Sequence, residues 1–202
     1  MGVHRDGLVG AALVVAVIGA GALVFARAGG EPESARRATL PEHRQRAPLA
    51  GSTAIACSPD EPGDRVLMDI TVRDQFGNAV SGAVVVAYNA DRAGLYTPRD
   101  SSTRMPRIRA TVTSDERGRC QILTVLPGPY PVGTEPPHVH FESWAMQAKV
   151  SYRTVWFEGD PLITTERRAW AARDAETEIV TLETRERSIP VCPVGIILRM
   201  DE

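Results

Sequence analysis

The apolar residues of this chain are gathered into short runs that glycine, proline and aspartate separate. The run at 66–72 alternates in part, and the run at 83–88 is rich in β-branched residues, so both favour strands over helices. Two more runs, 107–113 and 119–125, flank the turn sequence 115–118 and predict a hairpin. The other expected elements are a strand pair at 138–145 and 149–157, edge strands at 178–182 and 195–200, and a helix within 165–173. This pattern predicts an all-β fold, a β-sandwich, and not a parallel α/β sheet.

Length and charge narrow the range of functions. With 202 residues, of which 43% are hydrophobic, the chain is long enough for one domain whose core needs no disulfide bonds. The formal net charge is −2. Binding to nucleic acid normally requires a surplus of basic residues, so this charge argues against nucleic acid as the main partner.

The N-terminal segment predicts export. Residues 7–25 form an uninterrupted run of small and apolar residues after Arg5, and the sequence Ala26-Arg27-Ala28 that follows suits a signal peptidase. The length of the run lies between a secretory signal and a minimal membrane-spanning helix, so residues 1–28 are expected to be either a signal peptide or a membrane anchor. The arginines after the run outnumber Arg5, which weakly favours the opposite orientation. We expect the domain to be secreted, or membrane-anchored with the domain outside the cytoplasm.

The domain itself is expected at residues 57–202. Residues 29–56 are rich in Pro, Glu, Arg and Ala and have no sustained apolar period, which predicts a flexible spacer. Cys57 opens the domain and Cys192 nearly closes it, so a disulfide bond between them is expected in an oxidising compartment. Cys120 lies in an apolar strand pattern and is expected to be a small core residue. The alternative is three unpaired thiols in a reducing compartment.

Two histidines and two tyrosines are the candidate metal ligands. His138 and His140 are the only histidines after residue 56, and on a strand their i, i+2 spacing places both imidazoles on one face. Tyr130 lies in a segment that two prolines and a glycine constrain, and Tyr96 follows Gly94. Each of these residues taken singly is more often a surface or core residue. Together they predict a ferric site, because phenolate is a hard anionic ligand that ionises at neutral pH only beside a strong Lewis acid.

Six motifs carry a resemblance to a known family. They are Gly82-Ala83-Val84-Val85-Val86, Gly94-Leu95-Tyr96, Thr113-Ser114-Asp115-Glu116-Arg117-Gly118-Arg119, Pro127-Gly128-Pro129-Tyr130-Pro131, Pro137-His138-Val139-His140-Phe141 and Phe157-Glu158-Gly159-Asp160-Pro161-Leu162. In the order and spacing of these motifs, residues 69–164 resemble the intradiol ring-cleavage dioxygenases, the family of the protocatechuate and catechol dioxygenases. The matching stretch is about half of the chain.

The resemblance implies a role for each candidate ligand. Tyr96, Tyr130, His138 and His140 match the family's four ligands of a non-haem ferric ion, Fe(3+). Tyr130 would be the axial phenolate that the substrate displaces, with His138 opposite it, while Tyr96 and His140 would be equatorial. The implied reaction cleaves a catechol-type ring with O2, between the two hydroxyl-bearing carbons, to a muconate-type diacid. Tyr130 and Tyr96 would then be catalytic as well as metal-binding, and the displaced Tyr130 would take a proton from the substrate.

Two positions depart from the pattern of that family. Glu135 stands three residues before His138, where the family usually has an arginine that stabilises the electron-rich substrate. At about Thr154 the family has a glutamine in the substrate pocket. The candidates to supply the cation instead are Arg107, Arg109 and Arg153. The charge reversal at Glu135 leaves open the alternative of a non-catalytic exported binding module with the same fold.

Overall fold

The computed structural model describes residues 53–97, 105–184 and 188–201. The expected signal or anchor segment at 7–25, and the expected spacer up to residue 52, lie outside the described residues. Among the residues that are described, no helix is both long and apolar enough to cross a membrane.

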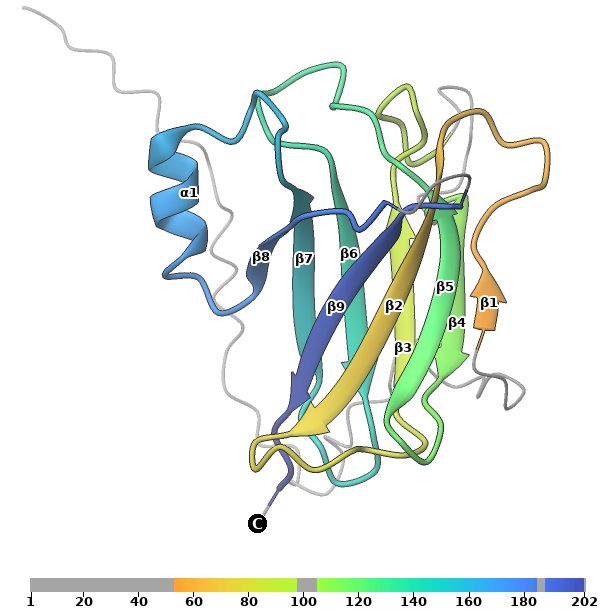
Figure 1. Ribbon diagram of the computed structural model, residues 1–202, viewed down its shortest axis with the longest axis vertical. Coiled ribbons are helices and arrows are strands. Elements are labelled where there is room, and N and C mark those ends of the chain that lie inside the picture. Colours follow the sequence, from red (N-terminus) through yellow and green to blue (C-terminus); the bar gives the residue numbers. More distant parts are fainter. Residues whose placement is uncertain (1–52, 98–104, 185–187, 202) are drawn as a thin grey trace, which may run out of the picture. The chain divides into compact units, whose positions relative to one another are not determined.

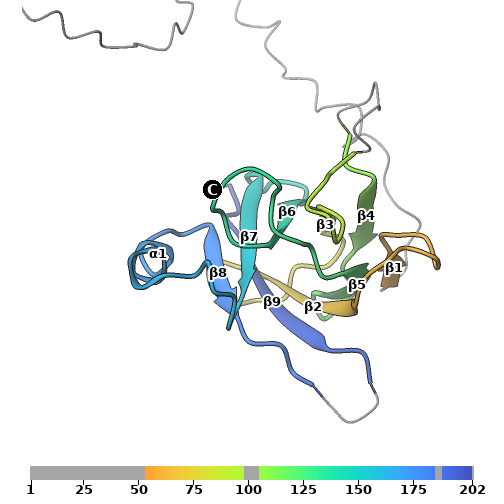
Figure 2. The same cartoon turned by 90° about the horizontal axis from the view of Figure 1, so that it is seen from above.

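Two β-sheets face each other across a common core (Figures 1 and 2). The first sheet has the strand order β1-β5-β2-β9, with β1 at Thr53–Ile55, β5 at Arg119–Val125, β2 at Arg65–Asp74 and β9 at Val191–Leu198. The second sheet has the order β4-β3-β6-β7-β8, with β4 at Ile108–Thr113, β3 at Val84–Asn89, β6 at His138–Trp144, β7 at Ser151–Phe157 and β8 at Thr177–Val180. The predicted β-sandwich is confirmed, as are the antiparallel pair β6–β7 and the two edge strands β8 and β9.

The core follows from the alternation of apolar residues along the strands. Every second residue of β2 and of β9 is buried, so each of these strands presents one apolar row to the facing sheet. The second sheet also presents a row of apolar side chains to this core. In that row Val139 is 0% exposed and Phe141 is 1% exposed. The residues between these inward positions on β6, including His138 and His140, therefore face away from the core, on the outer face of the five-stranded sheet.

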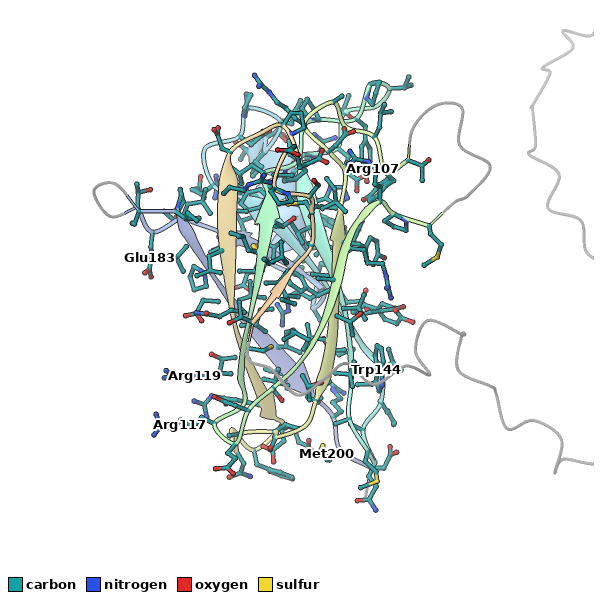
Figure 3. All side chains as sticks on the ribbon, turned by 90° about the vertical axis from the view of Figure 1, so that its right-hand side faces the viewer. Arg107, Arg117, Arg119, Trp144, Glu183 and Met200 are labelled. Carbon is teal, nitrogen blue, oxygen red and sulfur yellow. The ribbon has the colours of Figure 1, made fainter. Side chains whose placement is uncertain are left out.

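The predicted hairpin at 107–125 is wrong. The turn does form, because the Asp115 carboxylate accepts hydrogen bonds from the amides of Arg117 and Arg119, both at 2.8 Å. However, β4 pairs only with β3 and β5 pairs with β2 and β1, so the turn carries the chain from one sheet to the other. The turn lies at the opposite end of the sandwich from Arg107, as Figure 3 shows for Arg117 and Arg119. Turn residues indicate that the chain reverses direction. They do not indicate which sheet the next strand joins, because the apolar residues of β5 could pack in either sheet.

Strand β1 lies inside the range that was expected to be spacer. It pairs in parallel with β5, with Ala54 opposite Ile122, and the amide of Ala56 continues the ladder by donating to the carbonyl of Leu123 at 2.9 Å. The β-sheet structure thus begins before residue 57. Three residues are too short a run for a period-2 pattern to stand out in the sequence.

All three cysteines are free thiols, so the expected Cys57–Cys192 disulfide is also wrong. Cys192 lies on β9, at one edge of its sheet, and Cys57 follows β1, at the other edge. The two strands between them place the edges about 14 Å apart, whereas a disulfide needs Cα atoms within about 7 Å. Cys120 is 0% exposed, in agreement with its expected place in the core.

The expected helix forms as α1, Thr165–Ala171, and packs outside the sandwich beside β8 (Figure 2). Thr164 caps it, since its side chain accepts from the amide of Arg167 at 3.3 Å. A second small core, separate from the main one, joins the helix to the outer face of β7 and β8. It contains Trp156, Ile163, Ala171 and Ile179. The helix therefore closes one flank of the face that carries the histidines.

Candidate metal centre

The structure brings all four candidate ligands together. The phenol oxygens of Tyr96 and Tyr130 are 2.8 Å apart, and the Tyr130 oxygen is 2.9 Å from Nε2 of His138. Nε2 of His140 is in turn 2.9 Å from Nε2 of His138. Four donor atoms from two loops and one strand thus converge on one point at the outer face of the five-stranded sheet.

Strand pairing places the two imidazoles. On β6, His140 lies between Tyr88 of β3 and Thr154 of β7 in the register of the sheet, and His138 lies opposite Trp156. The Tyr88 ring is 5.1 Å from the His140 ring, centroid to centroid, and covers one side of it. Tyr88 and Trp156 therefore form part of the wall around the donors, to which the sequence pattern alone did not point.

Two glycines bring the tyrosine-bearing loops into backbone contact. Gly94 has a positive φ of 77°, and a Cβ atom there would lie 2.0 Å from the carbonyl oxygen of Pro129. A Cβ atom on Gly128 would lie 2.0 Å from the carbonyl oxygen of Arg92. The amide of Gly128 also donates to the carbonyl of Asp91 at 2.9 Å. Because only glycine permits so close an approach, these two positions hold Tyr96 and Tyr130 side by side.

Arg107 anchors the Tyr96 loop. Its guanidinium binds the buried Glu61 carboxylate through both terminal nitrogens and lies 3.2 Å from Asp91. Its amide donates to the carbonyl of Tyr96 at 2.8 Å, and the Asp91 carboxylate accepts from the amide of Leu95 at 3.0 Å. The Arg107 guanidinium is thus already paired with the carboxylates of Glu61 and Asp91. Arg107 therefore does not replace the positive charge that the family usually has at the position of Glu135.

The other two candidate arginines lie on different faces of the five-stranded sheet. Arg109 is on the outer face with Tyr88, whereas Arg153 lies opposite the core residue Phe141 and is on the inner face. Arg153 forms an ion pair with Glu178 at 3.3 Å. Arg109 lies opposite Tyr88 on the neighbouring strand, and its buried Nη2 has no hydrogen-bond partner among the described residues. Neither residue lines the cavity that opens beside Tyr130.

The hydrogen bonds behind the imidazoles prepare them as ligands. Nδ1 of His138 lies 2.7 Å from the carbonyl oxygen of Pro136, which can only accept, so Nδ1 carries the proton and Nε2 keeps its lone pair. Nδ1 of His140 is 3.1 Å from the Thr154 hydroxyl. Such partners fix the orientation of metal-binding histidines in many proteins.

Burial disfavours the charged forms of Tyr96, Tyr130 and His140. Burial, together with the hydrogen bond to Tyr130, raises the pKa of Tyr96 above the range of an ordinary phenol. Burial also raises the pKa of Tyr130; the hydrogen bond from Tyr96 opposes this rise and the Glu135 carboxylate adds to it. Burial and the neighbouring His138 lower the pKa of His140 to about 4. The phenols therefore ionise only beside a strong positive charge.

The donor set fits a hard trivalent cation. His138 Nε2 has a single lone pair but two polar neighbours at 2.9 Å, an arrangement that a cation between the four donors would satisfy. No group of three or more His, Cys, Asp or Glu residues in the described part of the chain could hold a metal ion. The two phenols are thus needed to complete the site, and phenolate oxygen with imidazole suits ferric iron.

A cavity of about 430 Å³ opens beside Tyr130. Its lining includes the Tyr130 ring, the exposed Glu135, the Trp156 and Trp170 side chains and Arg167. The two tryptophan rings are stacked, with centroids 5.6 Å apart. Arg167, on α1, was not among the candidates drawn from the sequence, since it lies outside the motifs and reaches the cavity only through the packing of the helix.

The fold and the donors together define a β-sandwich protein in which two phenols and two imidazoles converge on one point. A family model described as Dioxygenase matches residues 38–192. This chain belongs to the intradiol dioxygenase family, whose members include catechol and protocatechuate dioxygenases. The expected family resemblance is thereby confirmed.

Known relatives agree with this assignment. The chain is 29% identical over 150 residues to the protocatechuate 3,4-dioxygenase beta chain of Burkholderia cepacia, covering 66% of this chain and 64% of the relative. It is 28% identical over 127 residues to the chlorocatechol 1,2-dioxygenase of Rhodococcus opacus, covering 53% and 49%. The chain thus spans less than two thirds of the length of either relative. The solved structure of catechol 1,2-dioxygenase from Pseudomonas arvilla shares the fold, with a TM-score of 0.62 and 22% identity over 77% of this chain and 58% of that one.

Proposed function

We propose that the protein is an iron(III)-dependent intradiol dioxygenase that cleaves a catechol-type ring with O2 to a muconate-type diacid. The observation that carries the proposal is the convergence of the Tyr96, Tyr130, His138 and His140 donor atoms, with successive contacts of 2.8 to 2.9 Å. The relatives named as chlorocatechol and protocatechuate dioxygenases support the substrate class. When bound to these donors, ferric iron would supply Lewis acidity to the two catechol oxygens.

The proposed reaction needs no external reductant. The carbon–carbon bond between the two hydroxyl-bearing carbons breaks, and each of these carbons gains one oxygen atom from O2. Both oxygen atoms end in the product, so each hydroxyl-bearing carbon becomes a carboxyl carbon and the catechol becomes a diacid.

Tyr130 is the donor best placed to accept a substrate proton. It is the only one of the four donors that lines the cavity, and its phenol oxygen lies within hydrogen-bond distance of both Tyr96 and His138. Burial and Glu135 raise the pKa of Tyr130, so its phenolate form is a strong base. A phenolate at this position would take the proton from the nearer hydroxyl of the catechol.

The alternative of a non-catalytic binding module is not favoured. Glu135 was its main support, because it replaces the cation expected near the substrate. The donor set is complete nevertheless, and a cavity of ligand size adjoins one of its phenols. The cavity would suit either function, but a module without chemistry has no evident use for two phenols beside two imidazoles.

We also propose that the enzyme works outside the cytoplasm, either secreted or anchored in the membrane. This rests on the uncharged apolar run at residues 7–25. Separating the cells into cytoplasm, membrane and exterior, with an antibody to the domain, tests the proposal. Finding the protein only in the cytoplasmic fraction would contradict it.

Iron content and the visible spectrum test the proposed function. Stoichiometric iron, a tyrosinate-to-iron absorption band that shifts with catechol, and a product heavier than the catechol by one O2 are the expected results. Tyr96→Phe should lose most of the iron and the band, because it removes one anionic ligand. Tyr152→Phe is the matched control, since Tyr152 lies on β7, in the sheet that carries the two histidines, but is not one of the converging donors. Equal iron in the Tyr96→Phe and wild-type proteins would refute the site.

A further inference from the structure

We propose that Arg167 selects catechols that carry a negatively charged substituent, which would occupy the cavity beside Tyr130. The inference rests on the proposed function, in that the catechol oxygens are held at the four donors. It adds the chemical character of the rest of the substrate, and it assigns that preference to a residue on α1.

The cavity continues directly from the donor set. Tyr130 belongs to both, and Trp156, on the cavity wall, is paired in register with His138 on the neighbouring strand. A ring bound at the donors would therefore have its free edge near the cavity. The volume of about 430 Å³ is within the range of small-molecule sites.

Arg167 is held in place by neutral partners. One terminal nitrogen donates to the carbonyl of Leu162 at 2.8 Å and the other donates to the Thr134 hydroxyl at 2.7 Å. No carboxylate oxygen among the described residues forms an ion pair with it. Its neighbour Arg168 is different, because both of its terminal nitrogens bind the Glu158 carboxylate at 2.7 Å. The charge of Arg167 is thus positioned but not neutralised by the residues that hold it.

Trp156 is a largely buried side chain of the cavity wall. The residue is 4% exposed, and its buried indole Nε1 has no hydrogen-bond partner in the described part of the chain. Because this nitrogen is fully buried, the indole N–H is not open to the cavity. The Arg167 guanidinium is therefore the charged donor of this wall, and it favours an anionic acceptor, such as a carboxylate.

Glu135 opposes this preference without cancelling it. Its carboxylate lines the same cavity and repels an anion, but Glu135 is exposed while Arg167 is half-buried. Solvent and salt screen an exposed charge more strongly than a partly buried one. The net effect favours the anion at Arg167, and removal of the Glu135 charge should increase the preference.

Matched acids and amides test the inference on the full-length protein. We would titrate the iron-loaded protein without O2, using 3,4-dihydroxybenzoate and 3-(3,4-dihydroxyphenyl)propanoate against their amides. Binding would be followed by tryptophan fluorescence, because two of the three tryptophans line the cavity. The wild type should bind at least one acid about tenfold or more tightly than its amide, as expected for one charge-assisted contact.

Variants then assign the preference to one residue. Arg167→Gln should reduce the ratio of acid to amide affinity to near one, Arg167→Lys should restore part of it, and Glu135→Gln should increase it. Arg168→Gln is the matched control and should leave the ratio unchanged. Equal binding of acid and amide by the wild type, an unchanged ratio in Arg167→Gln, or tighter binding of the amine 3,4-dihydroxyphenethylamine would each overturn the proposal. Failure of the dioxygenase function would appear instead as bound catechols that are not cleaved once O2 is admitted.

Discussion

The two imidazoles of the site are held from behind by partners of different chemistry. The carbonyl of Pro136 can only accept, so it fixes the tautomer of His138. The Thr154 hydroxyl behind His140 can either donate or accept. The proton of neutral His140 can therefore sit on either ring nitrogen, whereas the neutral tautomer of His138 that Pro136 fixes has its lone pair on Nε2. The site combines one fixed and one adaptable imidazole.

At the residue scale we predict a pH dependence of stability for the iron-free protein. The pKa of His140 is lowered to about 4 by burial and by His138, from an ordinary value of 6.5. Between these values the unfolded chain binds the proton and the folded chain does not, so stability falls as the pH drops from 6.5 towards 4. The expected loss from this residue is about 1 to 3 kcal/mol.

Urea unfolding of the iron-free protein at a series of pH values measures this loss. His140→Asn removes the titrating group and should flatten the dependence between pH 6.5 and 4, the two values that bracket the shift. An equally steep dependence in the variant would show that another group is responsible.

Between elements, the close contact of the two tyrosine loops gives the donor set its rigidity. Gly94 meets the backbone of the Tyr130 loop and Gly128 meets the backbone of the Tyr96 loop, each at a distance that excludes any side chain. Neither loop belongs to a sheet, so their mutual contact replaces the ladder of hydrogen bonds that holds β6. The phenols are thus placed by glycine and the imidazoles by strand pairing.

At the element scale we predict that Gly128→Ala weakens iron binding by about tenfold or more, by analogy with the loss of groups that orient metal ligands. The added methyl group would push the two loops apart and move one phenol out of reach. Gly195→Ala is the matched control, because a Cβ atom on Gly195 meets nothing within 4 Å and neither glycine has a positive φ. Competition with a chelator measures the affinity, and equal values for both variants would contradict the prediction.

The same loops and strands show which parts of the fold and of the candidate site the sequence predicts. Alternating burial in β2 and β6 was visible as alternating residue types, and the i, i+2 spacing placed His138 and His140 on one face. Tyr96 and Tyr130 were candidates because of their glycine and proline neighbours, and the family motifs then implied that they belong together, since no local pattern relates two loops. Arg167 reaches the cavity only because α1 packs against β7 and β8, a contact that local sequence does not encode. The hairpin between β4 and β5 failed for the same reason, because a turn does not specify which sheet receives the next strand.

For the whole molecule, the arrangement of the cysteines shows that stability comes from the core and not from a covalent link. Cys120 and Cys192 are both 0% exposed and belong to the main core. Burial raises the pKa of each to about 12. Cys57 is half-buried and its sulfur accepts a hydrogen bond from Arg65 at 2.9 Å. Each thiol therefore has a separate place in the sandwich.

We predict that three thiols react with a thiol reagent when the protein is unfolded without reductant. In the folded protein Cys57 should react first, while the two buried thiols, which carry almost no thiolate at neutral pH, should react only through unfolding. Mass spectrometry of the labelled protein identifies the modified residue. A single reactive thiol after unfolding would contradict this prediction, because it would mean that two of the cysteines form a disulfide bond.

The parallel pairing of β2 with β9 makes the order of synthesis matter. The ribosome produces β9 after every residue of the donor set and of the cavity. Until β9 emerges, β2 has an unpaired edge, and the inner face of its sheet lacks Val194, Ile196 and Leu198. A chain that stalls before residue 191 would carry all four donors on an unfinished sandwich with an open strand edge, which is a template for aggregation. Translation must therefore run through β9 before the four donors have a stable support.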